Sequence, residues 1–86
     1  MLIQFFSNYA TALRSAGRHE EALQWYELCL SINPSDAGTH ANIAFTLHLG
    51  KYFNLAITRY HTALSFQPNF TFAADMLSKA MVDSTV

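Results

Sequence analysis

Residues 42–68 read NIAFTLHLGKYFNLAITRYHTALSFQP, and residues 8–34 read NYATALRSAGRHEEALQWYELCLSINP. When the two stretches are aligned, they share a skeleton of residues at a constant offset of 34 positions. The identical pairs include Asn8 and Asn42, Ala10 and Ala44, Leu13 and Leu47, Ala22 and Ala56, Tyr26 and Tyr60, Leu30 and Leu64, and Pro34 and Pro68. A fixed period of this length is typical of stacked helical repeats, so the chain is expected to be all-α and to form an α-solenoid.

The expected helices cover residues 2–16, 19–32, 37–49, 53–66 and 71–83. Gly17 and Gly50 end the first helix of each pair, because glycine readily adopts the backbone conformation found just after a helix. Pro34 and Pro68 separate the units, because proline cannot continue a helix interior. Gly50 comes one residue earlier in its unit than Gly17, so a slightly different second hairpin turn is expected.

The period and the glycine and proline positions resemble those of the tetratricopeptide repeat, a helix–turn–helix unit of 34 residues. The resemblance implies a first unit over residues 1–36, a second over 37–70, and the first helix of a third unit with a short tail over 71–86. Each repeat buries its apolar face on its neighbours, and at least three are usually needed for stability. We therefore expect the chain to be part of a longer superhelix.

The repeat pattern also predicts which residues pack between helices. Small side chains allow paired helices to approach closely, and aromatic side chains fill the space between layers. The expected packing residues are Ala10, Ala22, Tyr26, Cys29 and Pro34 in the first unit, and Ala44, Ala56, Tyr60, Ala63 and Pro68 in the second.

In a tetratricopeptide superhelix, the first helix of each unit lines a concave groove. The resemblance places there Gln4, Ser7, Asn8, Thr11 and Arg14, then Ala41, Asn42, Phe45 and His48, and finally Phe72, Asp75, Met76 and Lys79. The amides of Asn8 and Asn42 can donate to and accept from a bound peptide backbone, although local hydrogen bonds within the helix pair are an equal alternative. Phe45, Phe72 and Met76 can form an apolar floor for a partner helix, although Phe72 also suits packing between repeats.

The composition excludes several classes of partner. Apolar residues make up 51% of the chain and charged residues 13%, so the chain is too apolar to be disordered. The net charge is −1, and lysine and arginine occur singly, so no nucleic acid or anionic membrane is expected as a partner.

Residues 1–6 are largely apolar but lack a preceding basic segment, so no signal peptide and no membrane span are expected. A single cysteine is typical of a reducing compartment, and an intracellular protein is expected.

The residue pattern also predicts no catalysis, metal or cofactor. The histidines at positions 19, 40, 48 and 61 lack the spacing of a zinc site, and no cysteine pair accompanies them. Cys29 takes a small-residue position of the repeat, and no oriented base can be named beside it. The chain is therefore expected not to be an enzyme and not to act on a small-molecule substrate.

A more specific resemblance covers residues 41–81. The segment Tyr60-His61-Thr62-Ala63-Leu64, followed by Thr71-Phe72 and Met76-Leu77, is similar to the last repeats of the subunit-6 type scaffold proteins of the anaphase-promoting complex. The segment Glu21-Ala22-Leu23 resembles the preceding repeat. Ser78 replaces a glycine that is usual in that family, and Gly50 is shifted by one position.

This resemblance implies a non-catalytic scaffold in ubiquitin-dependent protein degradation during the cell cycle, located in nucleus and cytoplasm. The implied partners are other subunits of the ubiquitin ligase and a small helical or extended accessory peptide. The alternative is a peptide-binding adaptor of the co-chaperone kind. The clamp of such adaptors requires several groove cations, but this chain has Ser7, Thr11, Phe72 and Met76 there, and only Asn42 agrees.

Overall fold

The computed structural model describes residues 2–86, and their secondary structure is entirely helical. The helices are α1 (Leu2–Ser15), α2 (His19–Ile32), α3 (Ala37–Leu49), α4 (Phe53–Phe66) and α5 (Thr71–Asp83). They lie where the sequence predicts them, except that α1 ends at Ser15 rather than at residue 16. The all-α repeat fold is therefore confirmed, while the division into units at residues 36 and 70 stays a prediction.

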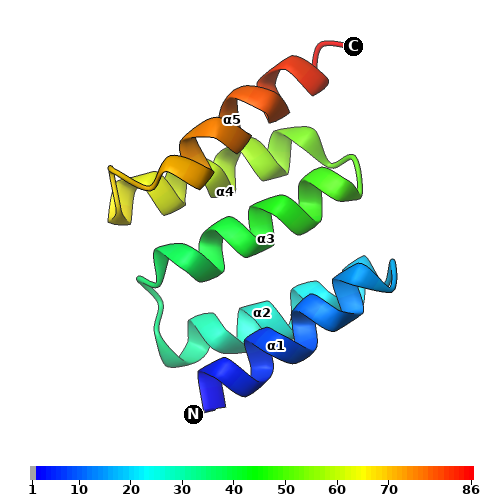
Figure 1. The fold of residues 1–86 in the computed structure, drawn as a ribbon, viewed down its shortest axis with the longest axis vertical. Helices are drawn as coiled ribbons and strands as arrows, with labels where there is room; N and C mark the ends of the chain where they lie inside the picture. Colours follow the sequence, from blue (N-terminus) through cyan, green and yellow to red (C-terminus); the bar gives the residue numbers. More distant parts are fainter. Residues whose placement is uncertain (1) are drawn as a thin grey trace.

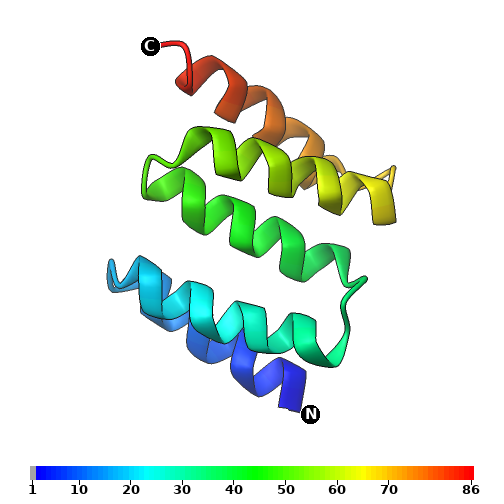
Figure 2. The same ribbon diagram turned by 180° about the vertical axis from the view of Figure 1, so that it is seen from behind.

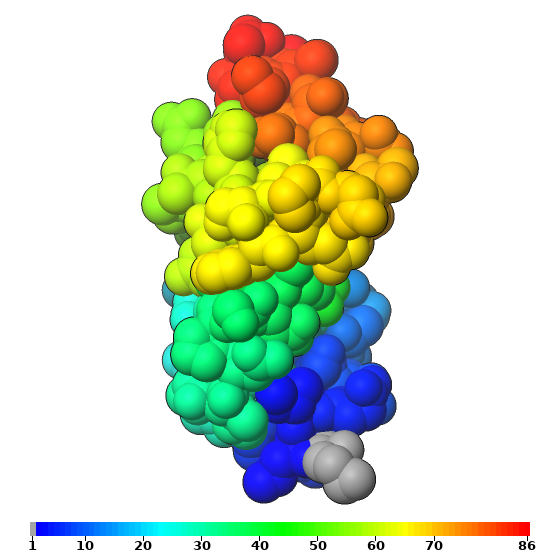
Figure 3. All heavy atoms as spheres, turned by 90° about the vertical axis from the view of Figure 1, so that its left-hand side faces the viewer, coloured from blue at the N-terminus to red at the C-terminus, as the bar shows by residue number. Residues whose placement is uncertain are grey.

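The helices follow one another along the long axis of the molecule, which measures 37 × 28 × 16 Å along its principal axes. Figure 1 shows α1, α3 and α5 towards the viewer, with the two chain ends at opposite ends of the stack. Turning the molecule brings α2 and α4 forward (Figure 2). The space-filling view shows the same order, from the N-terminal end to the C-terminal end, with each helix pair touching the next (Figure 3). None of the helices within residues 2–86 combines the length and the apolar character needed to cross a membrane.

Small side chains form the contacts at the centre of this stack. Ala10, Ala22, Ala44 and Ala56 are completely buried, as are Cys29 and Ala63. Tyr26 and Tyr60 are the largest of the fully buried side chains, and each belongs to one of two core clusters. This arrangement follows from the 34-residue period, because equivalent positions in two identical folds meet equivalent neighbours.

Pro34 and Pro68 do not pack between the helices, so grouping them with the packing residues was wrong. Both prolines are exposed in the turns after α2 and α4. The helices end just before them, and the backbone N–H groups of Asn33 and Gln67 close the last turns on the carbonyls of Cys29 and Ala63. The prolines therefore act by stopping the helices rather than by filling space.

The two hairpin turns have the same geometry, contrary to the expectation from the position of Gly50. Arg18 N–H donates to the Leu13 carbonyl and Gly17 N–H to the Arg14 carbonyl, and the bonds from Tyr52 and Lys51 repeat this pattern 34 residues later. This is the Schellman motif, whose penultimate residue adopts a left-handed conformation. Gly17 holds that place with φ +81°, and Lys51 holds it in the second turn with φ +67°. The second turn therefore keeps its shape without a glycine at the position that favours one.

Candidate partner-binding groove

The groove asparagines differ in their surroundings. Asn8 is exposed on α1, and its side-chain oxygen accepts a hydrogen bond from Gln4 Nε2 at 3.1 Å. Asn42, at the equivalent place on α3, is half-buried, and its side-chain amide makes no hydrogen bond to any residue within 2–86. The local-bond alternative therefore describes Asn8, whereas the Asn42 amide is left with its hydrogen-bonding capacity for another molecule.

Arg14 lies between aromatic rings from two helices. Its guanidinium carbon is 4.9 Å from the centre of the Phe45 ring and 5.9 Å from that of Tyr26. The Tyr26 hydroxyl is in turn hydrogen-bonded to Thr11 Oγ1 at 2.7 Å, so Thr11 holds the ring on which Arg14 rests. The nitrogen Nη1 of Arg14 is buried and has no hydrogen-bond partner among the described residues. Such stacking orients the guanidinium and leaves N–H donors unsatisfied.

The apolar groove residues surround a cavity of about 460 Å³ between α3 and α5. Phe45 and Met76 line it, and Phe45 also meets Phe72 edge-on with ring centres 6.0 Å apart. The rest of the lining is His48, Leu49, Lys51, Phe53, Lys79 and Asp83. Phe72 keeps 44% of its surface exposed beside this cavity. The structure thus brings Phe45, Phe72 and Met76 together, as the sequence interpretation required.

His48 is a buried structural residue rather than a free groove side chain, which corrects its placement among the contact residues. It is 7% exposed, its Nε2 lies 2.7 Å from Asp83 Oδ2, and its Nδ1 lies 3.4 Å from the Tyr60 hydroxyl. These contacts tie the last turn of α5 to α3 and α4. Sequence reasoning did not single out Asp83, although its register position on α5 corresponds to that of Leu49 on α3, directly beside His48.

Burial controls the acidity of two side chains of the core. It raises the pKa of the Tyr60 phenol well above its usual value, and the charge of Arg14 opposes this shift only in part. Burial likewise raises the pKa of the Cys29 thiol, which donates to the carbonyl of Ile3 at 3.6 Å. A thiol in this environment stays protonated and is a poor nucleophile. Within residues 2–86, no three histidine, cysteine or acidic side chains come together as metal ligands would.

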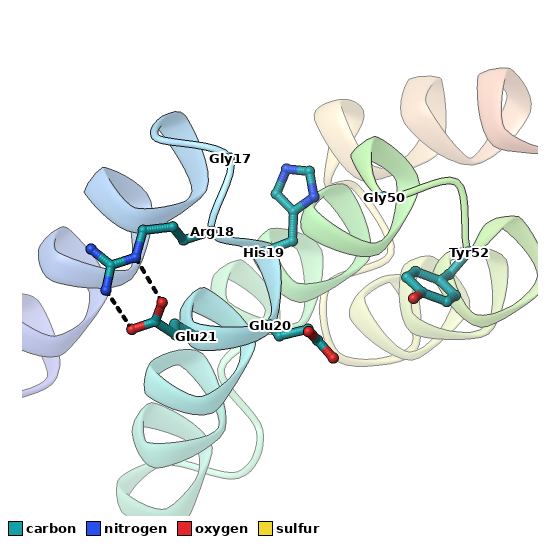
Figure 4. A pocket seen from close by; sticks show the side chains of 7 residues that line it. All are labelled: Gly17, Arg18, His19, Glu20, Glu21, Gly50 and Tyr52. Atoms are coloured by element: carbon teal, nitrogen blue, oxygen red, sulfur yellow. Dashed lines mark hydrogen bonds and ion pairs between the residues drawn. The ribbon is translucent and has the colours of Figure 1, made fainter.

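A second hollow, of about 350 Å³, lies where the two hairpin turns face each other, and the sequence interpretation missed it. Figure 4 shows Arg18 and Glu21 joined there by two hydrogen bonds, both 2.7 Å long, with His19 and Tyr52 on either side of Gly50. A hollow of about 310 Å³ lies at the corresponding place one repeat later, bordered by Lys51, Tyr52 and Ser84 among others. Such hollows follow from stacking hairpins with turns on one edge; Glu20 and Lys51, which border them, form no ion pair within residues 2–86.

The paired helices with a 34-residue period define the class of this fold. Residues 3–36 match the family model of the tetratricopeptide repeat. Residues 3–36 are therefore a tetratricopeptide repeat, and the second helix pair has the same geometry as the first.

The chain is also similar to particular proteins over most of its length. It is 36% identical over 74 residues to anaphase-promoting complex subunit 6 of Dictyostelium discoideum, covering 86% of this chain and 8% of that protein. It is 36% identical over 76 residues to anaphase-promoting complex subunit 6 of Arabidopsis thaliana, covering 88% of this chain and 14% of that protein. It is 28% identical over 81 residues to anaphase-promoting complex subunit cut9 of Schizosaccharomyces pombe, covering 94% of this chain and 12% of that protein. The chain thus spans between 8% and 14% of the length of these curated relatives.

Proposed function

We propose that this chain is a non-catalytic scaffold that binds other proteins along the face formed by α1, α3 and α5. The observation behind this proposal is that the side-chain amide of Asn42, half-buried on α3 without a hydrogen bond to any residue within 2–86, lies on one of the two helices that border the apolar cavity. Groups of this kind are matched by a partner in most protein interfaces. The proposed contact residues are Asn8, Thr11, Arg14, Asn42, Phe45, Phe72 and Met76. The buried side chain of His48 forms part of the cavity lining.

The partners follow from the relatives, which are named as subunits of the anaphase-promoting complex. We propose that the chain forms part of such a subunit and acts in ubiquitin-dependent protein degradation during the cell cycle. Its partners are then other subunits of that ligase and a small accessory peptide, helical or extended. A nuclear and cytoplasmic location is part of the same proposal.

A second candidate function is that of a peptide-binding adaptor that grips the acidic C-terminal tail of a chaperone. Asn42 favours it, because its free amide lies where the clamp of such adaptors requires an asparagine. The other clamp positions oppose it, because Ser7, Thr11, Phe72 and Met76 supply no positive charge. Binding of a terminal carboxylate there lacks the charge-assisted hydrogen bonds that make such clamps strong.

Affinity purification of the tagged chain from dividing cells tests the two candidates. Scaffold function predicts that other subunits of the ubiquitin ligase co-purify in stoichiometric amounts and that Asn42→Ala reduces this recovery. The matched control is Asn54→Ala, because Asn54 is exposed at the start of α4, away from the groove. Recovery of chaperones without ligase subunits would favour the adaptor, and equal losses for both asparagine variants would contradict the assignment of the groove.

A further inference from the structure

The positive charges of this chain are divided between two environments. Arg18 is paired with Glu21 at 2.7 Å, and Arg59 is paired with Glu27 at 2.9 Å. The other basic side chains, Arg14, Lys51 and Lys79, form no ion pair with any residue within 2–86. Lys51 and Lys79 line the cavity between α3 and α5, and Arg14 stacks on Phe45, which lines it too. Of the three unpaired basic side chains within residues 2–86, Lys51 and Lys79 therefore line this cavity, with Lys51 also bordering the hollow of about 310 Å³, and Arg14 lies over the Phe45 ring of the cavity wall.

Arg14 differs from Lys51 and Lys79 in being half-buried: its Nη1 is closed to solvent and has no acceptor within residues 2–86, whereas Nε and Nη2 are not closed in this way, so a partner's carboxylate has to bind through these two nitrogens. The Nη1 atom of Arg59 is buried and unpaired, but the neighbouring Nη2 of Arg59 already binds Glu27. Arg14 has no carboxylate partner among residues 2–86. A guanidinium placed over an aromatic ring has restricted freedom of movement, and a carboxylate is the acceptor that fits its fork of N–H donors best.

The acidic side chains near the cavity do not satisfy these cations. Asp83 lines the cavity, but its Oδ2 lies 2.7 Å from His48 Nε2. Asp75 is exposed on α5 and forms no ion pair within residues 2–86. Three of the remaining acidic residues, Glu20, Glu21 and Glu27, belong to α2 on the other side of the stack. The sixth acidic residue, Asp36, precedes α3 at the end opposite Lys51 and accepts a hydrogen bond from Thr39 at 2.6 Å, so Lys51 and Lys79 face Asp83 alone among the acidic residues that line the cavity.

The cavity itself suits an apolar side chain. Phe45, Leu49, Phe53 and Met76 supply its apolar walls, and its volume of about 460 Å³ lies within the range of sites that take one large side chain or a small ligand. Phe45 belongs to both places, because its ring lies under the Arg14 guanidinium and also lines the cavity. An extended chain advances about 3.4 Å per residue, so one short segment can reach both places.

We propose that this groove binds an acidic segment of a partner protein, which places an apolar side chain in the cavity between α3 and α5 and a carboxylate on Arg14. Lys51 and Lys79 attract further acidic residues at the cavity rim. This inference rests on the proposed scaffold function and adds the chemistry of the partner, namely an apolar residue with an aspartate or glutamate about two to four positions away. An internal carboxylate is meant, not the chain terminus gripped by the adaptor clamp.

Selection from a random peptide library displayed on phage, with the folded 86-residue chain as bait, tests this chemistry. The expected result is enrichment of peptides with an apolar residue and a nearby Asp or Glu at one fixed spacing. A selected peptide is then synthesised with a fluorescent label, together with a version in which the acid is replaced by its amide. We expect the amide version to bind about 10-fold more weakly, as for the loss of one charge-assisted hydrogen bond.

The variant Arg14→Gln should bind the acidic peptide about as weakly as the unchanged chain binds the amide version, and the two changes should not add. Arg18→Gln is the matched control, because Arg18 is exposed and paired with Glu21, and it should bind both peptides normally. If Arg14→Gln unfolds the chain, seen as loss of helical circular dichroism, the double variant Lys51→Gln and Lys79→Gln replaces it and should also weaken the acidic peptide selectively.

Enrichment without acidic residues, or equal binding of acid and amide peptides, overturns the proposal. Failure to enrich any peptide overturns it as well. Neither result affects the co-purification experiment, which tests the scaffold function without reference to the charge of the partner.

Discussion

Tyr26 and Tyr60 occupy equivalent positions in the two repeats and are both fully buried, yet their hydroxyl groups have different neighbours. The Tyr26 hydroxyl has a close partner in Thr11 at 2.7 Å. Within residues 2–86, the Tyr60 hydroxyl has only His48 Nδ1 as a partner, at 3.4 Å, in a region enclosed by apolar side chains. The same residue in the same fold position is thus left in a less polar environment in the second repeat, with a consequence for the pH dependence of folding.

Burial raises the pKa of Tyr60 above its ordinary value of 10.0, so the folded chain binds the phenolic proton more tightly than the unfolded chain does. This contribution to stability is complete below pH 10 and is lost progressively as the pH rises above it. We expect the chain to lose helicity above about pH 10, with tyrosinate absorbance appearing in the same transition. Tyr60→Phe should keep its helicity to higher pH. Identical alkaline transitions for both proteins would contradict this role of Tyr60.

A second prediction concerns the left-handed residues of the two turns, where the repeats provide their own control. A side chain at positive φ costs about 1–2 kcal/mol relative to glycine, partly offset by the greater flexibility of glycine in the unfolded chain. Lys51→Gly should therefore raise the free energy of unfolding by about 0.5–1 kcal/mol, measured by urea denaturation. Gly17→Ala should lower it by about 1 kcal/mol. Changes of the same sign in both variants would show that φ does not control stability here.

At the scale of the helices, the sequence predicts the helix positions and buried residues that recur every 34 residues, and it does not predict the contacts between residues that do not recur. The helix positions and the buried pairs Ala10/Ala44 and Tyr26/Tyr60 follow from the 34-residue offset, because equivalent residues meet equivalent neighbours. The stacking of Arg14 on Phe45 has no such basis, since the residues 34 positions later are His48 and Lys79. Contacts made by non-repeating residues on different helices depend on side-chain geometry that no periodic pattern specifies.

The contact between His48 and Asp83 is of this second kind and holds the end of α5. Because α5 packs mainly against α4, its last turn depends on this bond for its attachment to α3. We expect Asp83→Ala to reduce hydrogen-exchange protection in the last turn of α5 by about 1–2 kcal/mol, as for the loss of a hydrogen bond to a buried group. Protection in α1 and α2 should not change.

Asp75→Ala is the control for this measurement, because Asp75 lies on the same helix, is exposed and forms no ion pair within residues 2–86. It should leave the protection of α5 nearly unchanged. A similar loss in both variants would mean that a negative charge on α5, rather than the bond to His48, maintains the helix.

At the scale of the whole molecule, the two helix pairs differ in what covers them. In the second pair, Thr39 and Ile43 of α3 are 3% and 1% exposed, because the first pair packs on them. The equivalent residues of α1 are Phe5, which is 64% exposed, and Tyr9. Tyr9 lies edge-on against Trp25, with ring centres 5.0 Å apart, so the outer face of the first pair is an aromatic surface. Exposed apolar surfaces of this kind promote association between molecules.

We therefore expect the isolated chain to associate with itself as its concentration rises, and Phe5→Glu to weaken this association with little effect on folding. An exposed side chain away from special contacts changes stability by about 0.5 kcal/mol or less, so the thermal midpoint should hardly move. Sedimentation velocity over a range of concentrations measures the association. Leu55→Glu is the matched control, since Leu55 is a 58% exposed apolar residue on α4, remote from the aromatic face. If both variants reduce association equally, general hydrophobicity is responsible. If only Phe5→Glu reduces association, the aromatic face of the first helix pair is the surface through which the molecules associate. In a longer array of repeats, the next helix pair would pack on this face.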